Sequence, residues 1–188
     1  MKIILASSNV HKVKEINAIV ENTGLEFILP PEGFDPIEDG KSFEENSFIK
    51  AKEAWNLGKT WTLADDSGLC IDALNGAPGI HSARYAETPQ LRIDRVLTEM
   101  KGIKERSARF KCCMTLINPE GEVAFSYTGI CEGSIIEEQR GLNGFGYDPI
   151  FLLQGSDKTM AELSEEEKNQ ISHRGRALKA VLEYLNSL

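Results

Sequence analysis

The sequence predicts an α/β fold with a mixed β-sheet. In the first half of the chain, apolar segments of strand length alternate with segments whose apolar residues recur at helical spacing. Further on, residues 107–117 and 122–136 alternate apolar and polar side chains, and the turn-forming Asn-Pro-Glu-Gly at 118–121 joins them as a hairpin. Interleaved strands and helices followed by a long hairpin favour a sheet with both parallel and antiparallel strands.

The composition argues against several classes of protein. The chain has 188 residues, 41% of them hydrophobic and 27% charged, which is enough for one domain with a sizeable core. A net charge of −8 gives no basic footprint for nucleic acid. The apolar start is too short for a signal peptide or a membrane span, and the four cysteines form no CxxC pair. We therefore expect buried reduced thiols, no nucleic-acid or membrane partner, and a cytoplasmic location.

Three strands and two helices are expected in the N-terminal part. The expected strands are residues 2–6, 25–29 and 61–65. Asn9 is placed to cap a helix that ends near Gly24. Ser42 and Glu45 have the spacing of a capping box, and Gly58 is the expected stop of the helix that they open.

Two helical regions are expected in the C-terminal part. Thr88, followed by proline, starts a helix that closes at Gly102. Ser164 and Glu167 form another capping box. On one continuous helix Lys168 and His173 would point well apart, so we expect a break near Ser172, which would cap a second helix.

The segment Ser-Ser-Asn-Val-His-Lys at residues 7–12 lies where a strand meets a helix. Free N–H groups at a helix N-terminus favour phosphate, and Lys12 would add a full charge. The segment lacks the glycines of a P-loop. A capped helix with a solvated lysine is therefore an equally good interpretation of this segment alone.

An Asp65-Asp66-Ser67-Gly68 segment follows the expected third strand, which puts two carboxylates at the end of a strand. Open α/β sheets place ligands there, and carboxylates bind Mg²⁺ and orient water. Glu38 is a candidate second ligand. Its rivals are Asp39, Glu44 and Glu45. The alternative is a turn in which aspartate caps backbone N–H groups. Asp72 is expected to be structural.

A glycine-rich loop, Asn-Gly-Phe-Gly-Tyr-Asp-Pro, covers residues 143–149. Gly144 and Gly146 allow close approach of the backbone, and Phe145 and Tyr147 offer faces on which a purine could stack. The alternative is a tight turn whose aromatic residues fill the core, and we expect one of the two aromatics to do so. Downstream, Lys168, His173 and Arg174 could reach a base or a phosphate; a solvated basic face is the alternative.

Together these stretches resemble the inosine/xanthosine triphosphate pyrophosphatase family. The resemblance spans nearly the whole chain in order. The matching segments are residues 7–15, 39–51, 63–85, 143–151 and 158–178. The combination of "ADDSGL", "GFGYDP" and "ISHR" in one chain is specific to that family.

The resemblance implies an elongated central mixed β-sheet flanked by helices, with two lobes and a substrate cleft between them, in one domain over residues 1–188. It also implies a homodimer. The implied reaction is hydrolysis of ITP, dITP and XTP to the monophosphate and pyrophosphate with Mg²⁺. This reaction keeps deaminated purines out of DNA and RNA.

The resemblance also assigns roles to residues. Asp66 would be the general base and a metal ligand, Glu38 a second metal ligand, and Asp65 and Lys50 helpers near the metal and phosphates. The residues implied to hold the triphosphate are Ser7, Ser8, Asn9, Val10, His11 and Lys12. Those implied to contact the rest of the substrate are Ser67, Phe145, Gly146, Tyr147, Asp148, Lys168, His173 and Arg174.

Two rival functions remain open on the sequence. One is a pyrophosphatase of similar fold that acts on pyrimidine nucleotides. The other is a nucleotide sensor without catalysis, against which the aspartate pair beside a phosphate-type segment argues. Substrate profiling distinguishes the pyrimidine-specific enzyme from a purine-specific one. Release of pyrophosphate distinguishes an enzyme from a sensor.

Overall fold

The structure is a computed structural model that describes residues 1–188, apart from the side chains of His11, Lys12 and Glu15. Across this described part, six strands form one sheet in the order β2-β1-β3-β4-β5-β6. They are β1 (Lys2–Leu5), β2 (Glu26–Ile28), β3 (Thr62–Ile71), β4 (Ser107–Ile117), β5 (Val123–Ile135) and β6 (Phe151–Leu153). β1 pairs in parallel with β2 and β3, whereas β5 and β6 are antiparallel. The predicted mixed sheet is confirmed.

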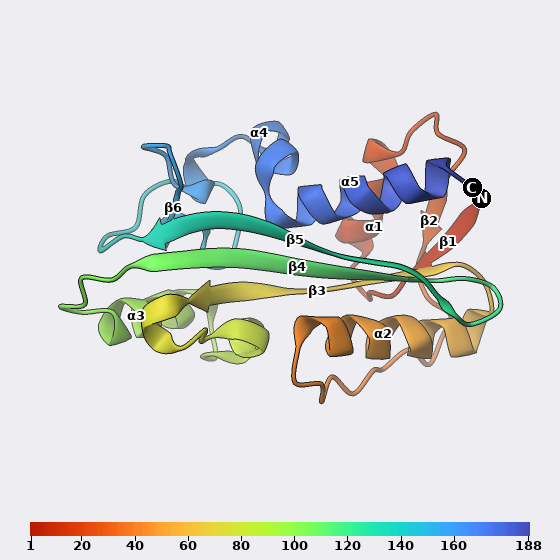
Figure 1. Cartoon of the computed structure of the whole chain (residues 1–188), viewed down its shortest axis with the longest axis horizontal. Coiled ribbons are helices and arrows are strands. Elements are labelled where there is room, and N and C mark those ends of the chain that lie inside the picture. The colour runs from red at the N-terminus through yellow and green to blue at the C-terminus, as the bar shows by residue number, and fades with distance from the viewer. The chain divides into compact units, whose positions relative to one another are not determined.

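Helices flank this sheet (Figure 1). The α-helices are α1 (Val10–Ile19), α2 (Phe43–Gly58), α3 (Pro89–Glu99), α4 (Glu165–Ile171) and α5 (His173–Asn186). Short 3-10 helices are η1 (Asp72–Leu74), η2 (Gly79–Arg84), η3 (Asp148–Ile150) and η4 (Met160–Glu162). Within the described residues, none of the helices combines the length and the apolar character that crossing a bilayer requires.

The chain forms two compact units. Unit 1 consists of Met1–Asp66, Cys113–Tyr127 and Ala180–Leu188. Unit 2 consists of Ser67–Cys112 and Thr128–Lys179. Strands β3, β4 and β5 and helix α5 contribute residues to both units, so each unit is built around a part of the sheet.

In unit 1, α2 packs on the strands through small side chains. Ala51 and Ala54 are fully buried in a cluster with Ile4 and Ala64. Small side chains let the helix lie close to the sheet, which places Lys50, the residue before Ala51, within reach of Asp66 on β3. In Figure 1, α2 and the C-terminal end of α5 lie on opposite sides of the unit 1 strands.

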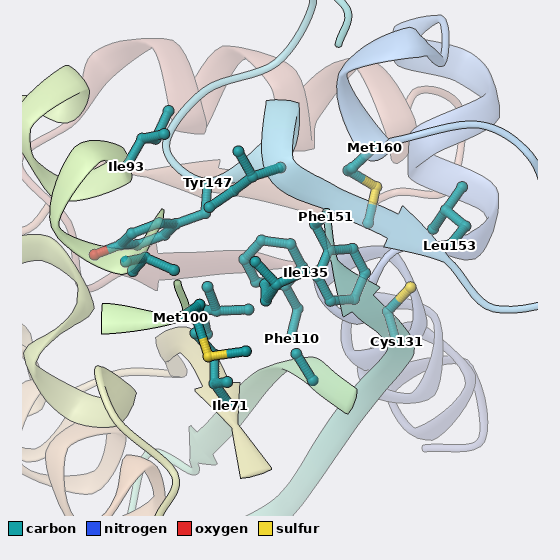
Figure 2. Close-up of a cluster of buried hydrophobic side chains, with 14 of the residues drawn as sticks. Ile71, Ile93, Met100, Phe110, Cys131, Ile135, Tyr147, Phe151, Leu153 and Met160 are labelled. Atoms are coloured by element: carbon teal, nitrogen blue, oxygen red, sulfur yellow. The ribbon is translucent and has the colours of Figure 1, made fainter. Parts of the chain in front are cut away.

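The core of unit 2 is larger and contains aromatic and sulfur-bearing side chains. Leu69 and Ile71 of β3, Phe110 of β4 and Phe151 of β6 all belong to it, and the rings of Phe110 and Phe151 lie 4.5 Å apart. Figure 2 shows this cluster, with Tyr147 extending into it from the glycine-rich loop. The four cysteines of the chain are buried and free, as predicted.

The capping signals place the helix starts correctly. Ser42 caps α2 by accepting from the N–H of Glu45 at 3.1 Å. Ser164 and Glu167 form the full reciprocal capping box of α4. At the end of α2, however, the left-handed position is Lys59, with φ of 49°, and Gly58 is the last helical residue.

Strand β3 is longer than predicted. The sequence indicates a strand that ends at Asp65, followed by a turn, but β3 runs unbroken through Asp66, Ser67 and Gly68 to Ile71. The prediction of carboxylates at a strand end is therefore wrong, because extending the strand buries the apolar residues that follow Gly68 in the core of unit 2.

Two further boundaries were tested by the structure. Helix α1 ends at Ile19 rather than near Gly24, because the chain turns there with positive φ at Asn22 and Gly24. The predicted break between α4 and α5 is confirmed. Ser172 has extended backbone angles, and its Oγ accepts from the N–H of Gly175 at 3.1 Å.

Candidate active site

The junction between β1 and α1 supplies the expected hydroxyl groups. The Asn9 N–H donates to Ser7 Oγ at 3.1 Å, and the carbonyl of Asn9 accepts the first helical bond, from Val13. Ser8 and Val10 are exposed at the same junction. The predicted ligands His11 and Lys12 lie outside the described side chains. Hydroxyls and helix N–H groups at one junction form a suitable anchor for phosphate.

A carboxylate–lysine cluster, defined as Glu38, Lys50, Asp65 and Asp66, lies in unit 1. Lys50 Nζ lies 3.1 Å from Glu38 Oε2 and 3.4 Å from Asp66 Oδ1. The loop before α2 carries Glu38, the third turn of α2 carries Lys50, and β3 carries both aspartates. The ammonium group of α2 therefore meets carboxylates from two other segments, the preceding loop and β3.

Charge and burial set the protonation of this cluster. Burial alone would lower the pKa of Lys50, but Asp65, Asp66 and Glu38 together raise it, so the lysine stays charged. Burial is the largest effect on Asp66 and raises its pKa; Lys50 and Asn46 oppose the rise, and Glu38 adds to it. In the metal-free protein the cluster thus pairs a charged lysine with a carboxyl group that takes up a proton more readily than an exposed aspartate does.

A polar cavity of about 290 Å³ opens beside the cluster. Its lining brings together Ser7, Ser8, Glu38, Lys50 and Asp65. The cavity therefore joins the hydroxyls at the start of α1 to the carboxylate–lysine cluster within unit 1. Phe34, Asp35 and Pro36 also line it. No motif of the sequence singles out these three residues.

The cluster fits a divalent cation held partly by its substrate. Among the residues that the structure describes, no three His, Cys, Asp or Glu side chains are gathered as a ready-made metal cage. Within the same set, Asp66 Oδ2 is buried without a hydrogen-bond partner. Mg²⁺ characteristically uses one or two carboxylates together with phosphate oxygens. An open carboxylate oxygen beside Glu38 is suited to that kind of binding.

A second cluster, the aromatic–cation cluster, lies in unit 2 and comprises Phe145, Asp148, Lys168, Arg174 and Ser67. The Phe145 ring is 64% exposed. Lys168 Nζ lies 4.4 Å from the ring centroid, and the Arg174 guanidinium carbon 5.6 Å from it. Arg174 also donates to Ser67 Oγ at 3.2 Å. An exposed ring flanked by two cations is a platform for a flat, electron-rich ligand.

Asp148 holds this platform in place. Its side chain is 4% exposed and forms an ion pair with Lys168. The same carboxylate accepts from the N–H of Phe145 at 3.1 Å. A Cβ on Gly144 would lie 2.1 Å from Asp148 Oδ2. Close approach of the backbone at this glycine was predicted, and in the described structure the Asp148 carboxylate occupies the space.

The two aromatics of the loop differ, as the sequence predicts. Tyr147 is 5% exposed and its ring lies in the unit 2 core, whereas Phe145 faces outward. The Tyr147 side chain is therefore not placed to stack on a base. His173 is also buried, and its ring stacks on Phe110 with centroids 4.8 Å apart. Gly146, with φ of 60°, completes the turn between the two aromatics.

One residue near the unit 1 cluster carried no sequence signal. Asn46 is buried in the first turn of α2, and its Oδ1 accepts from the Gly40 N–H at 2.9 Å. A Cβ on Gly40 would lie 2.6 Å from that oxygen. Asn46 thus fixes the loop that carries Glu38. The sequence gives no indication of this contact, because it depends on how the loop packs against the helix in the folded protein.

Comparison with known proteins identifies the family. The family model described as the Ham1 family matches residues 3–184. The chain belongs to the Ham1 family. A relative from Treponema denticola, named dITP/XTP pyrophosphatase, is 49% identical over 194 aligned positions that cover 98% of each chain. A protein of the same name from Bacillus anthracis is 44% identical and covers 97% of this chain and 95% of its own.

Solved Ham1 structures have the same fold. A HAM1 protein from Coxiella burnetii matches with a TM-score of 0.93, 41% identity and full coverage of both chains. The Staphylococcus aureus Ham1 protein matches with a TM-score of 0.92 and 38% identity, covering 100% of this chain and 99% of its own. The family predicted from the sequence motifs is thereby confirmed.

Proposed function

We propose that this chain hydrolyses the deaminated purine nucleotides ITP, dITP and XTP to the nucleoside monophosphate and pyrophosphate. The observation that carries the proposal is that relatives 41–49% identical over nearly the whole chain are named dITP/XTP pyrophosphatase. The reaction would remove these nucleotides from the pool before they enter DNA or RNA.

The carboxylate–lysine cluster is suited to the chemical step. Water attacks the α-phosphorus, the bond from that phosphorus to the α–β bridging oxygen breaks, and pyrophosphate leaves. Asp66 accepts the proton of the attacking water, for which its buried Oδ2 is open within the described part of the chain. Lys50 keeps Asp66 and Glu38 oriented and offsets negative charge. Positioning and charge stabilisation carry most of the catalysis in phosphoryl transfer.

Mg²⁺ is the metal that we propose for this site, held by Asp66 and Glu38. When bound, it would neutralise charge on the triphosphate and polarise the phosphate under attack. The hydroxyl-rich start of α1, with Ser7, Ser8 and Asn9, is proposed to hold phosphate oxygens, with Lys12 contributing a positive charge.

Selection of the base is proposed to rest on the aromatic–cation cluster. Phe145 offers a face for stacking. The ammonium group of Lys168 and the guanidinium group of Arg174 are donors without acceptor capacity. A 6-oxo purine presents an acceptor to such donors, whereas the amino group of adenine presents another donor. A site built for the oxygen therefore discriminates against adenine by setting one donor against another.

The direct test is a substrate and product profile in the presence of Mg²⁺. We expect dITP and XTP to be hydrolysed much faster than ATP, dTTP or dUTP, with one pyrophosphate formed per monophosphate. Chelation of the metal should abolish turnover. Faster hydrolysis of dUTP than of dITP would favour a pyrimidine nucleotide pyrophosphatase, and orthophosphate as the first product would refute attack at the α-phosphorus. A homodimer in the cytoplasm stays a prediction, testable by light scattering and fractionation.

A further inference from the structure

Ser82 lies at the meeting point of three segments of unit 2. Its buried Oγ accepts from the N–H of Leu69 at 2.9 Å and lies 2.6 Å from the carbonyl of Gly79, to which it donates. Its own carbonyl accepts from the Tyr147 hydroxyl at 2.7 Å. One serine thus joins β3, the η2 segment and the glycine-rich loop by three hydrogen bonds.

The Tyr147 hydroxyl is a reliable donor at this point. Burial raises the pKa of Tyr147 to about 12, so the phenol stays protonated across the physiological range. The ring is packed in the unit 2 core, as Figure 2 shows, and its hydroxyl donates to the Ser82 carbonyl. The hydroxyl therefore acts on the backbone of η2.

Tyr147, the donor of this hydrogen bond, adjoins a base-binding residue in the sequence. Asp148, the next residue, accepts from the Phe145 N–H and forms the ion pair with Lys168. A shift of the Tyr147 backbone would displace the Asp148 carboxylate and, through it, both the Phe145 ring and the Lys168 ammonium group.

The other end of the connection lies on the strand that carries Ser67. Leu69 follows Ser67 by two residues on β3, so a bond that holds the backbone of Leu69 also limits movement of the strand at Ser67. Arg174 donates to Ser67, and the N–H of Leu69 is held by Ser82. The hydrogen bonds of Ser82 therefore connect the strand that carries Ser67 to the loop that carries Phe145. These two segments supply the two sides of the aromatic–cation cluster.

We infer that Tyr147 and Ser82 are positioning residues that set the spacing of the base pocket, and that Tyr147 acts through the Ser82 carbonyl rather than on the substrate. This inference rests on the proposed function. It makes the hydroxyl of Tyr147 a determinant of affinity for the 6-oxo purine, although the hydroxyl lies in the core.

The test compares Tyr147→Phe with Tyr85→Phe, which is a matched control in the same unit. Tyr85 also packs against the unit 2 core, but its hydroxyl donates to Glu99 of α3 rather than to the loop or to η2. Each variant loses one oxygen atom. We measure KM and kcat for dITP, the Kd for dIMP by calorimetry, and the melting temperature.

We expect Tyr147→Phe to raise KM and the Kd for dIMP about fivefold, with kcat changed less than about twofold, as for loss of one neutral hydrogen bond. Tyr85→Phe should leave both constants unchanged. Ser82→Ala, which frees Leu69 from η2, should act in the same direction and serves as the second variant if Tyr147→Phe does not fold.

Three results would overturn the inference. They are equal effects of the two tyrosine variants, a lower melting temperature of Tyr147→Phe with unchanged KM and Kd, and a fall in kcat alone. Failure of the wild-type protein to hydrolyse dITP would instead refute the proposed function, and the calorimetric measurement of dIMP keeps the two failures distinguishable.

Discussion

Replacing Asp66 by asparagine is expected to stabilise the free protein at neutral pH while it destroys activity. The Asp66 side chain is 13% exposed, and among the described residues its Oδ2 has no hydrogen-bond partner. Burial raises its pKa above the ordinary value of 3.8. Between that value and the higher folded pKa, the folded state holds more protons than the unfolded state. Stability therefore falls as the pH rises through this window.

The size of the effect follows from two opposing contributions. A buried polar group without a partner costs about 1–3 kcal/mol, and more when it is charged, so burying the amide of asparagine costs less than burying the carboxylate. Removing the charge also removes the attraction to Lys50 across 3.4 Å, worth about 1 kcal/mol for a pair that is not fully buried. The net gain for Asp66→Asn is about 1 kcal/mol. In a chain of 188 residues this raises the melting temperature by about 2–4 °C.

The assay is thermal and urea-induced unfolding of the metal-free protein, measured near neutral pH and again at mildly acidic pH. Asp94→Asn is the control, because Asp94 is an exposed helical carboxylate that accepts from Gln90. It should change stability by less than about 0.5 kcal/mol. The advantage of Asp66→Asn should shrink as the pH falls and wild-type Asp66 becomes protonated. Lower stability of Asp66→Asn at neutral pH would refute the reasoning.

Two other substitutions test the anchors of the clusters. Lys168→Met leaves the buried Asp148 carboxylate without its cation, so we expect a loss of about 3 kcal/mol in urea unfolding; a loss below about 0.5 kcal/mol would contradict the buried ion pair. Gly40→Ala places a Cβ 2.6 Å from Asn46 Oδ1, which should displace the Glu38 loop. We expect the free energy of unfolding to fall by about 1–3 kcal/mol. In a metal titration, the Mg²⁺ concentration that gives half-maximal activity should rise several-fold. An unchanged Mg²⁺ requirement would show that this loop does not contribute to the metal site.

Local signals predicted much of the fold because the interactions behind them are local. The Ser42 cap, the Ser164 capping box and the break at Ser172 each depend on a side chain that bonds to a backbone group three residues away. Such bonds are fixed by spacing alone. The hairpin after Ile117 follows from alternation on both sides of a turn sequence.

The length of β3 illustrates what local signals miss. Asp65-Asp66-Ser67-Gly68 has the composition of a turn, yet the segment is extended. The strand continues because the residues after Gly68 are buried in the unit 2 core, which is a tertiary effect. The free energy that favours a turn is small compared with the free energy gained by burying Leu69 and Ile71.

The candidate site was predictable as a set of residues, but much of its geometry was not. Motifs indicated Asp66, Glu38 and Phe145, yet the contact of Lys50 with two carboxylates depends on how α2 packs on the sheet. The sequence indicated that one of two loop aromatics fills the core without saying which. The structure shows that it is Tyr147, whose hydroxyl finds a backbone acceptor.

Pyrophosphate release from dITP by the Asp66→Asn variant tests the central claim most directly. Loss of the general base should lower kcat by about 10²–10⁴-fold relative to the wild-type protein. The melting temperature should stay at or above the wild-type value, which shows that the variant is folded. A folded Asp66→Asn variant that releases pyrophosphate at a rate close to that of the wild-type protein would contradict the role of Asp66 and, with it, the proposed mechanism.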